Sequence, residues 1–398
     1  MNVPKLRFKE FTDKWQKVPL NLFTNIYGGY AFKSENLLNY KAKYQVIKMG
    51  NVNNNTLNLE KNPSYLNTIS QKELPYLLEK NDIILTLTGT FGKKDFGYSY
   101  QIKNETNLLL NQRLAVFKIT NSNYSANFLK YILLNNTFLN KFFRFSVGGT
   151  GNQANVSIQD IKSFKIPFPK LEEQNKIANF LTTVDKKITN LENTIISLEN
   201  QKKGLLQQIF SQKLRFKDKN GNNYPNCEKK KLEDIAIFLD NKRKPLEQSE
   251  RIHGKYPYYG ASGIIDYIND YIFDEELVLL SEDGANIIDR NYPICYIATG
   301  KYWVNNHAHV LKVKSQYVNK FICESLEQLN YTKYNTGTAQ PKLNQDVCRK
   351  IILSIPCLEE QTKIANFLSA FDRKLDNQKA QLEHWKQIKK GLLQQMFV

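Results

Sequence analysis

The sequence predicts an α+β fold: two globular mixed α/β domains separated by two long helices that form an antiparallel coiled coil, arranged as a pseudo-two-fold tandem repeat. Two observations predict it. Leu171–Leu181 returns almost unchanged as Leu358–Leu368, and Lys202–Phe210 returns as Lys389–Phe397 at the same offset. The pentapeptide KLRFK also occurs twice, near the start of the chain and directly after the first long block. A shared opening and a shared ending at fixed spacing indicate two tandem copies.

The repeat divides the chain into four segments. Each repeated block contains no Pro and almost no Gly, so we expect a long helix there. A strand-like run that contains Pro precedes each block, at Phe164–Pro169 and at Ile352–Pro356. Pro ends extended structure and favours a helix start. We therefore expect a first globular domain at 1–170, a first spacer helix at 171–212, a second globular domain at 213–357 and a second spacer helix at 358–398.

Apolar residues in both blocks alternate between spacings of four and three, which is the a/d pattern of a coiled-coil seam. A polar Gln378 interrupts the second series, and it either sets the register or is a tolerated mismatch. The pairing also allows a simpler interpretation, in which the helices serve only for dimerisation. The expected pairing residues are Ile177, Leu181, Val184, Ile188, Leu191, Ile195 and Leu198 in the first helix, and Ile364, Leu368, Phe371, Leu375, Leu382 and Trp385 in the second.

The segments between these shared sequences hardly match each other, yet their predicted elements are alike. A buried strand that ends on Gly is expected at 81–89 in the first insert and at 274–284 in the second. Another strand follows in each, at 114–118 and 308–313. We therefore expect one topology in both inserts, with different surface residues.

A polar loop with glycine comes near the end of each insert, at 148–153 and 336–340. Glycine lets the backbone approach a phosphate or a base edge closely. Gln and Asn side chains can bind adenine through two hydrogen bonds. A turn that requires positive φ would explain the same glycines, so both interpretations stay open.

The formal net charge is +18 and the isoelectric point is near 9.4. Most of the excess lies in the first insert, since residues 1–170 carry +13 and residues 211–357 carry +3. A polyanion is a natural partner for such a chain because each Lys or Arg near a phosphate releases a counterion. A solvated basic surface without a partner is the alternative.

The five Cys residues form no CxxC pair, which argues against a disulfide framework and a structural zinc site and suits a reducing compartment. No charged and apolar leader opens the chain, and no apolar run is long enough to cross a bilayer. We therefore expect a soluble protein of the cytoplasm, without a membrane partner.

These motifs resemble the specificity subunits of bacterial Type I restriction-modification systems. In that family a long helix begins P-x-L-x-E-Q-x-K-I-A-x-F-L and ends K-K-G-L-L-Q-Q-x-F. A stretch at 256–265, with 279–285 after it, also looks like a target-recognition domain of the family. The matching residues are Pro169, Leu171, Glu173, Gln174, Lys176, Ile177, Ala178, Phe180 and Leu181 in the first copy, and Pro356, Leu358, Glu360, Gln361, Lys363, Ile364, Ala365, Phe367 and Leu368 in the second.

The resemblance implies that each insert is a target-recognition domain that reads one half of a bipartite sequence in double-stranded DNA. The paired helices would set the gap between the halves and bind two methyltransferase subunits, which restriction and translocase subunits would join. Because the inserts differ, the target would be asymmetric. S-adenosylmethionine, ATP and Mg²⁺ would bind to those partner subunits, and this chain would hold no cofactor.

The motifs of three catalytic classes are missing. The chain lacks the [DN]-P-P-[FYW] tetrapeptide of an adenine methyltransferase, the GxxxxGK[ST] loop of a translocase and the Asp with Glu-x-Lys of a nuclease. The resemblance likewise implies a chain that is not an enzyme. His307 and His309 could bind a metal, but no third ligand is evident, and a structural pair or a DNA contact explains them as well. No metal site is therefore predicted.

Candidate DNA contacts follow from residue type, since Arg and Lys suit guanine or phosphate, and Asn and Gln suit adenine. Glu173, Gln174, Glu360 and Gln361 either cap the helices or contact a partner. A coiled-coil assembly scaffold with protein-binding inserts is the alternative function. The candidate DNA contacts are Lys33, Lys93, Lys94, Arg113, Arg144, Asn152 and Gln153 in the first insert, and Lys242, Arg243, Lys244, Tyr259, Ser262, Asn305, Asn306, Lys333 and Gln340 in the second.

Overall fold

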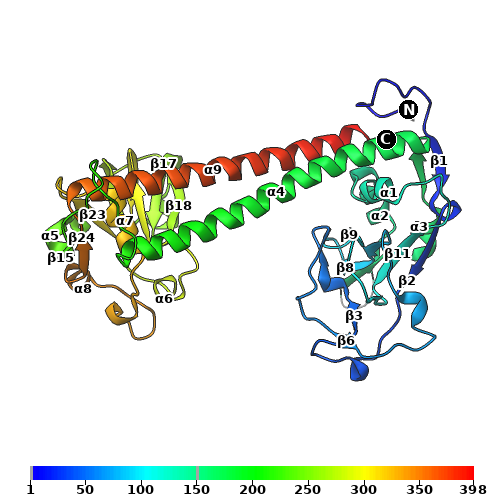
Figure 1. Cartoon of the computed structure of the whole chain (residues 1–398), viewed down its shortest axis with the longest axis horizontal. Coiled ribbons are helices and arrows are strands. Elements are labelled where there is room, and N and C mark those ends of the chain that lie inside the picture. The colour runs from blue at the N-terminus through cyan, green and yellow to red at the C-terminus, as the bar shows by residue number, and fades with distance from the viewer. Residues whose placement is uncertain (1–2, 149–151) are drawn as a thin grey trace. The chain divides into compact units, whose positions relative to one another are not determined.

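The chain folds into two compact units. A computed structural model describes residues 3–148 and 152–398 (Figure 1). Unit 1 comprises Met1–Glu192 with Gln381–Val398, and unit 2 comprises Asn193–Ala380. The division falls inside both long helices, so each unit contains a part of each helix. Within the described residues, no helix combines the length and the hydropathy that a membrane span requires.

A four-stranded antiparallel sheet forms the centre of unit 1, in the order β2-β11-β7-β9. Its middle strands are the two apolar runs that the sequence predicts, and every residue of β7 is buried. The Gly-ended run does not continue as one strand, because Thr88–Thr90 leaves this sheet and pairs with β13 as strand β8. The strands of the sheet are β2 Thr24–Gly28, β7 Ile83–Thr86, β9 Ser99–Gln101 and β11 Leu114–Ile119.

Unit 2 repeats this sheet in the order β16-β23-β20-β21, again antiparallel. The β20 strand is buried along its whole length, as β7 is. The shared strand order confirms the prediction of one core topology in two inserts of unlike sequence. The strands are β16 Ala236–Phe238, β20 Leu277–Ser281, β21 Cys295–Ala298 and β23 Ala308–Val313.

The two units differ around these central sheets. Unit 1 adds the sheet β10-β3-β6, the sheet β12-β13-β8 and the hairpin β4-β5, whereas unit 2 adds the sheet β18-β17-β22-β19. In both, the strand before a long helix pairs with a strand near the start of the unit, as β1-β14 and β15-β24. In unit 1 the remaining strands and α-helices are β1 Gln16–Pro19, β3 Tyr44–Ile47, β4 Val52–Asn53, β5 Thr56–Leu57, β6 Tyr65–Leu66, β8 Thr88–Thr90, β10 Leu108–Leu110, α1 Ala126–Leu133, α2 Asn136–Arg144, β12 Val147–Gly148, β13 Gln153–Asn155, α3 Ile158–Ser163 and β14 Lys165–Phe168. In unit 2 they are β15 Glu228–Lys231, α5 Leu232–Ile235, β17 His253–Gly260, β18 Gly263–Ile268, β19 Phe273–Asp274, α6 Asn286–Asp289, β22 Lys301–Val304, α7 Asn319–Glu327, α8 Gln345–Arg349 and β24 Ile352–Ile355.

The two repeated blocks form the long helices α4, Leu171–Phe210, and α9, Leu358–Gln395. They pair antiparallel within each unit, as their ion pairs show. In unit 1, α4 residues 185 and 192 meet α9 residues 389 and 386 at 2.7 and 2.9 Å. In unit 2, residues 199 and 202 meet 379 and 372 at 2.8 and 2.6 Å. The predicted fold class is thereby confirmed.

Burial along the helices follows the predicted 3.5-residue spacing. The expected α4 positions are all buried, and Gln378 on α9 is half-buried between more apolar neighbours. The stripe that faces the partner helix is more exposed on α9 than on α4. Buried are Ile177, Leu181, Val184, Ile188, Leu191, Ile195, Leu198, Ile364 and Leu368, and half-buried are Phe371, Leu375, Leu382 and Trp385.

The end of each long helix packs into the core of the unit that contains it. In unit 1, Phe397 beyond α9 lies 6.3 Å from the Trp15 ring and 5.3 Å from the Phe128 ring. In unit 2, Phe210 of α4 lies 5.6 Å from Phe321. This packing explains why the two GLLQQ blocks are so similar.

The KLRFK block binds the start of the helix that follows it in each unit. Arg7 donates to both carboxylate oxygens of Glu173 at 2.7 and 2.8 Å, and Arg215 makes the same pair with Glu360. Both glutamates are 2% exposed. The two glutamate side chains therefore hold the fold together, and neither is free to contact a partner.

The glutamines next to them have an equally internal role. Gln174 donates to the carbonyl of Pro169 at 2.9 Å and accepts from the amide of Ser125 at 2.8 Å. Gln361 repeats the first contact with the carbonyl of Pro356 at 2.9 Å. Both side chains are 1% exposed. The repeated L-E-E-Q sequence thus joins insert and helix in both units.

Candidate nucleic-acid interface

One set of backbone hydrogen bonds fixes the geometry at one end of the central sheet in unit 1, where β7 ends and β11 begins. This end of the sheet, and the same end in unit 2, is called the shared edge. After β7, the Leu87 amide donates to the carbonyl of Arg113 at 3.1 Å, and the Leu87 carbonyl accepts from the amide of Val156 at 3.1 Å. These bonds join the end of β7, the start of β11 and the segment after β13. Three chain segments with polar residues therefore meet at one edge.

Unit 2 has the same bonds at the same place. After β20, the Glu282 amide donates to the carbonyl of His307 at 2.9 Å, and the Glu282 carbonyl accepts from the amide of Leu343 at 2.7 Å. The two units therefore share one backbone frame, in which Glu282 corresponds to Leu87, His307 to Arg113 and Leu343 to Val156.

This frame places Gln153 and Gln340 at equivalent positions. In unit 1, Asn155 pairs with Thr88, and Gln153 lies two residues earlier in β13. In unit 2, Lys342 pairs with Asp283, and Gln340 again lies two residues earlier. Both glutamines are exposed. The predicted glycine loops therefore end at the same edge, although Gly149, Thr150 and Gly151 lie outside the described residues.

Other candidates of unit 1 gather around Gln153. The carbonyl of Asn152 accepts from the amide of Phe91 at 2.9 Å, and two residues later the amide of Lys93 donates to Thr90 at 3.0 Å. The ammonium of Lys94 lies 5.7 Å from the Phe143 ring, next to Arg144. Lys93, Lys94, Arg144 and Asn152 are all exposed. Lys33, which is also exposed, is paired with Glu35 at 3.7 Å, and among the residues that the structure describes no contact joins it to this group.

In unit 2 the candidates lie on segments that meet at the end of β22. The amide of Lys244 donates to the carbonyl of Val304 at 3.2 Å, and the amide of Asn305 donates to that of Tyr259 at 3.0 Å. Tyr259 is half-buried against Tyr302. Lys242, Lys244, Ser262, Asn306 and Lys333 are exposed. The backbone segments that carry Lys244, Tyr259 and Asn306 therefore meet next to His307.

Arg243 and Asn305 have internal roles instead. Arg243 is 13% exposed and pairs with Glu282 at 2.6 Å. Its guanidinium also donates to the carbonyl of Ala308 at 2.9 Å. Asn305 is 4% exposed and accepts from the amide of His307 at 2.8 Å. Both side chains face the protein interior because their polar groups are used in holding loops, so we leave them out of the candidate contact surface.

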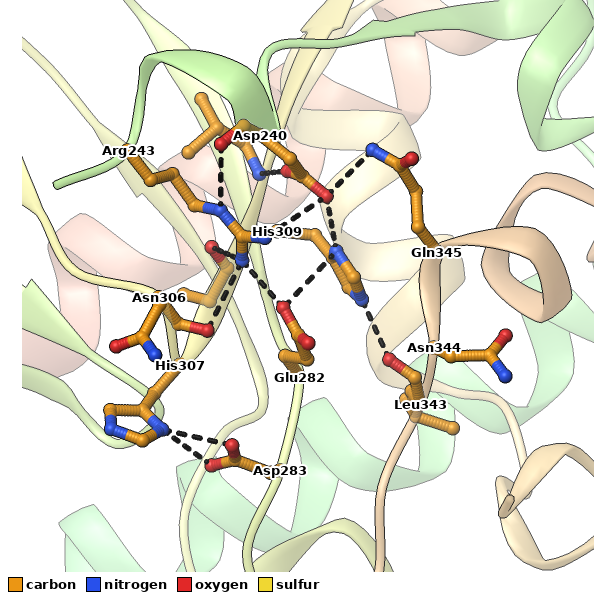
Figure 2. Close-up of polar contacts among 12 residues, drawn as sticks. Asp240, Arg243, Glu282, Asp283, Asn306, His307, His309, Leu343, Asn344 and Gln345 are labelled. Atoms are coloured by element: carbon orange, nitrogen blue, oxygen red, sulfur yellow. Dashed lines mark hydrogen bonds and ion pairs between the residues drawn. The ribbon is translucent and has the colours of Figure 1, made fainter. Parts of the chain in front are cut away.

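The two histidines point in different directions, as Figure 2 shows. His307 is half exposed and its Nδ1 lies 2.8 Å from Asp283. His309 is fully buried and its Nδ1 lies 2.6 Å from Asp240. Glu282 is the third member of a group that could hold a metal ion within the described residues, so ligands that the sequence pattern did not reveal are present around His309.

The contacts of this group favour ion pairs over a metal site, because the Arg243 guanidinium lies 2.6 Å from Glu282 and 3.5 Å from Asp240. Burial alone would lower its pKa, but the hydrogen bond to Asp240 and contacts with neighbouring acidic groups raise the pKa of His309 to about 10. Its Nε2 donates to the carbonyl of Leu343 at 2.7 Å, so both ring nitrogens already have acceptors. The Arg243 guanidinium already neutralises Glu282. The group is therefore an internal network of ion pairs.

The sequence contained a signal for this shared edge that the strand prediction did not use. L-N-Q-R-L-A-V-F-K, which starts at Leu110, corresponds to V-N-N-H-A-H-V-L-K, which starts at Val304. An Asn stands two residues before Arg113 and also two before His307. Exposed polar residues are therefore placed at the start of the central strand in both units.

The chain was compared with known proteins. A family model described as the type I restriction modification DNA specificity domain matches residues 12–200 and 224–384. A Haemophilus influenzae protein named as a type I restriction enzyme specificity subunit is 38% identical over 141 residues. That match covers 35% of this chain and 36% of the relative's own length, so the chain spans about a third of it.

Longer matches have lower identity. The type I restriction enzyme MjaVIII specificity subunit of Methanocaldococcus jannaschii is 25% identical over 358 residues, which cover 82% of this chain and 80% of that protein. The crystal structure of a type I restriction-modification S subunit from M. genitalium matches with a TM-score of 0.64 and 19% identity, over 100% of this chain and 99% of that one. The structural match supports the fold.

Proposed function

The chain belongs to the type I restriction modification DNA specificity family, and from this membership we propose that its two units read the two halves of an asymmetric, interrupted target in double-stranded DNA. In this proposal the chain has no catalytic activity of its own. It directs bound methyltransferase subunits, two in number, and restriction and translocase subunits to the target. S-adenosylmethionine, ATP and Mg²⁺ act in those partners, in the cytoplasm where the DNA lies.

The observation that carries the proposal is the shared edge with different side chains. The backbone frame places Gln153 and Gln340 at equivalent positions, but beside them it presents Arg113 in unit 1 and His307 in unit 2. Equal placement with unequal chemistry suits two readers of different sequences. An assembly scaffold would not require exposed polar residues at matched positions of two unlike domains.

Charge gives independent support. The basic excess of the first insert, +13 over residues 1–170, includes Lys93, Lys94 and Arg144 around Gln153. Cations that surround a base-reading side chain bind phosphates and orient the protein on the duplex. The same positions would have no reason to cluster if the basic surface were only solvated.

Methylome sequencing tests the proposed function directly. Cells that express this chain together with a methyltransferase subunit of its system should acquire methyladenine in a single asymmetric motif with an unspecified gap. Cells that express either component alone should not. A methylome that stays unchanged although the two proteins form a complex would contradict the proposal.

Substitution of the equivalent glutamines should affect one half-site each. We expect Gln153→Ala to relax one adenine-containing position of the first half-site, and Gln340→Ala one position of the second, because each two-bond contact contributes about 1–3 kcal/mol of discrimination. This corresponds to about a 5- to 150-fold loss of preference, measured as methylation of single-base variants of the target. Gln71→Ala and Gln316→Ala, at exposed sites away from this edge, are the matched controls. A motif that is unchanged in both test variants would remove these residues from the interface.

A further inference from the structure

The buried ion network of unit 2 has no counterpart at this place among the described residues of unit 1. In the shared backbone frame Glu282 corresponds to Leu87, and His309 corresponds to Ala115, two residues after Arg113. Leu87 and Ala115 are 5% and 0% exposed and belong to the apolar core. The same fold is thus built at this place with apolar residues, so its stability does not require the charges of unit 2.

The network contains two acidic and two basic side chains. Asp240 and Glu282 face Arg243 and protonated His309, with separations of 2.6 Å from Asp240 to His309 and 2.6 Å from Arg243 to Glu282. Gln345 adds a hydrogen bond to Asp240 at 2.8 Å. Buried ion pairs seldom add net stability because desolvation opposes their attraction, but they can select one conformation of what they join.

What the network joins is the base of the loop that carries Gln340. His309 donates to the carbonyl of Leu343 at 2.7 Å, directly after the loop. Lys342 lies 3.3 Å from Glu282. Figure 2 shows the carbonyl of Leu343 and the side chain of Gln345 directed at the network from this one segment. Contacts from residues 342, 343 and 345 therefore fix where the loop leaves the core.

The loop itself is closed by short contacts. The side chain of Asn335 accepts from the amides of Gly337 and Lys342 at 3.0 and 2.9 Å. A Cβ at Gly337 would lie 1.8 Å from the carbonyl oxygen of Gln340, so only glycine allows this turn. Residues 335–342 thus behave as one piece, and the orientation of that piece is determined at its base.

Unit 1 positions Gln153 in another way. There the residue is part of strand β13, which pairs with β8 through Gln153 with Thr90 and Asn155 with Thr88. In unit 2 the corresponding pairing is reduced to the single bridge between Asp283 and Lys342. Where the strand pairing is lost, the ion network is present.

We propose that the network of Asp240, Arg243, Glu282 and His309 positions the loop 335–342, so that the second half-site is read correctly only while His309 and Glu282 hold the base of the loop. The four are positioning residues and make no contact with DNA. The inference rests on the proposed function and deepens it, because it assigns part of the specificity of one half-site to buried residues.

The test introduces into unit 2 the apolar residues that unit 1 has at the equivalent positions. Glu282→Leu with His309→Ala removes one charge of each sign and installs the residues that the same frame holds in unit 1. In the complex with its methyltransferase subunit, we expect the first half-site to be unchanged and at least one position of the second to accept other bases. Methylation at such relaxed sites should come within about ten-fold of the intact target.

Two single variants separate positioning from general stability. His309→Gln keeps a donor near the place of Nε2 and should preserve the motif, whereas His309→Ala should relax it. Hydrogen exchange of the DNA-free chain should show faster exchange in 335–343 for His309→Ala than for His309→Gln. Hydrogen exchange therefore tests whether His309 positions the loop even if the double variant does not fold.

The outcomes are distinct. Relaxation confined to the second half-site supports the inference. An unchanged motif in His309→Ala and in a folded double variant overturns it, and so does equal behaviour of His309→Ala and His309→Gln in both readouts. An unmodified chain that directs no methylation at all would instead contradict the proposed function.

Discussion

Arg7→Ala is expected to lower the free energy of unfolding of unit 1 by about 3–5 kcal/mol. The guanidinium donates to both carboxylate oxygens of Glu173, at 2.7 and 2.8 Å, and the Trp15 indole adds a third donor at 3.2 Å. Because Glu173 is 2% exposed, loss of Arg7 leaves a desolvated charge with one neutral donor. Urea denaturation measures the loss, and hydrogen exchange assigns it to unit 1.

The control removes both charges together. Arg7→Leu with Glu173→Gln leaves no unpaired charge and keeps an acceptor for Trp15, so it should recover most of the lost stability. Arg215→Ala is the matched change in unit 2, and its effect should be smaller because Arg215 is 23% exposed whereas Arg7 is 10% exposed. If Arg7→Ala left the unfolding midpoint in place, or if the double variant were no more stable than the single one, the ion pair would not have this role.

The repeated sequence blocks predicted much of the fold, but they did not predict which of these blocks contact each other. Periodicity and identity predict two long helices with their seam, because a helical seam depends on residues three and four apart. Arg7 and Glu173 are 166 residues apart, and no local pattern states that they touch. From the sequence, Glu173 and Gln174 could either cap the helix or contact a partner. Their burial in the structure shows that their role is internal.

The sequence did not reveal the shared edge because the offset between equivalent residues of the two copies changes along the chain. KLRFK recurs at 213 − 5 = 208 residues, the Asn before the central strand at 305 − 111 = 194, and the helix start at 358 − 171 = 187. Because the inserts differ in length on both sides of this strand, no single alignment without gaps reveals the match. Backbone hydrogen bonds depend on strand register and not on loop length, so they show the equivalence of Gln153 and Gln340 directly.

Residue type also failed to separate surface from interior at Arg243 and Asn305. Both stand among candidates that are exposed, and Arg is a frequent DNA contact. Arg243 is instead directed inward by Asp240 and Glu282, which lie 3 residues before it and 39 residues after it. The second of these partners comes from a different strand, so its presence could be known only from the fold.

The stability of unit 2 should fall as the pH rises from about 6.5 to about 10. Burial would lower the pKa of His309, but the hydrogen bond to Asp240 and the neighbouring Cys348 and carboxyl groups raise it from 6.5 to about 10. A pKa that is higher in the folded state adds stability below pH 6.5, and this is lost as pH rises through the folded value. At about 1.4 kcal/mol for each pKa unit, the loss amounts to about 3–5 kcal/mol.

Comparison with His309→Gln isolates this contribution, since Tyr and Lys residues also titrate towards pH 10. The groups that face the imidazole are Asp240, Glu282, Arg243 and Cys348, and all four remain in the variant. The difference in unfolding midpoint between the unmodified chain and the variant, followed by urea denaturation, should therefore shrink steadily between pH 6.5 and pH 10. A difference that stays constant across this range would mean that His309 is neutral in the folded protein, and it would then form no ion pair with Asp240. Since one neutral imidazole cannot donate to both Asp240 and Leu343, that result would also mean that one of these two contacts is made in another way.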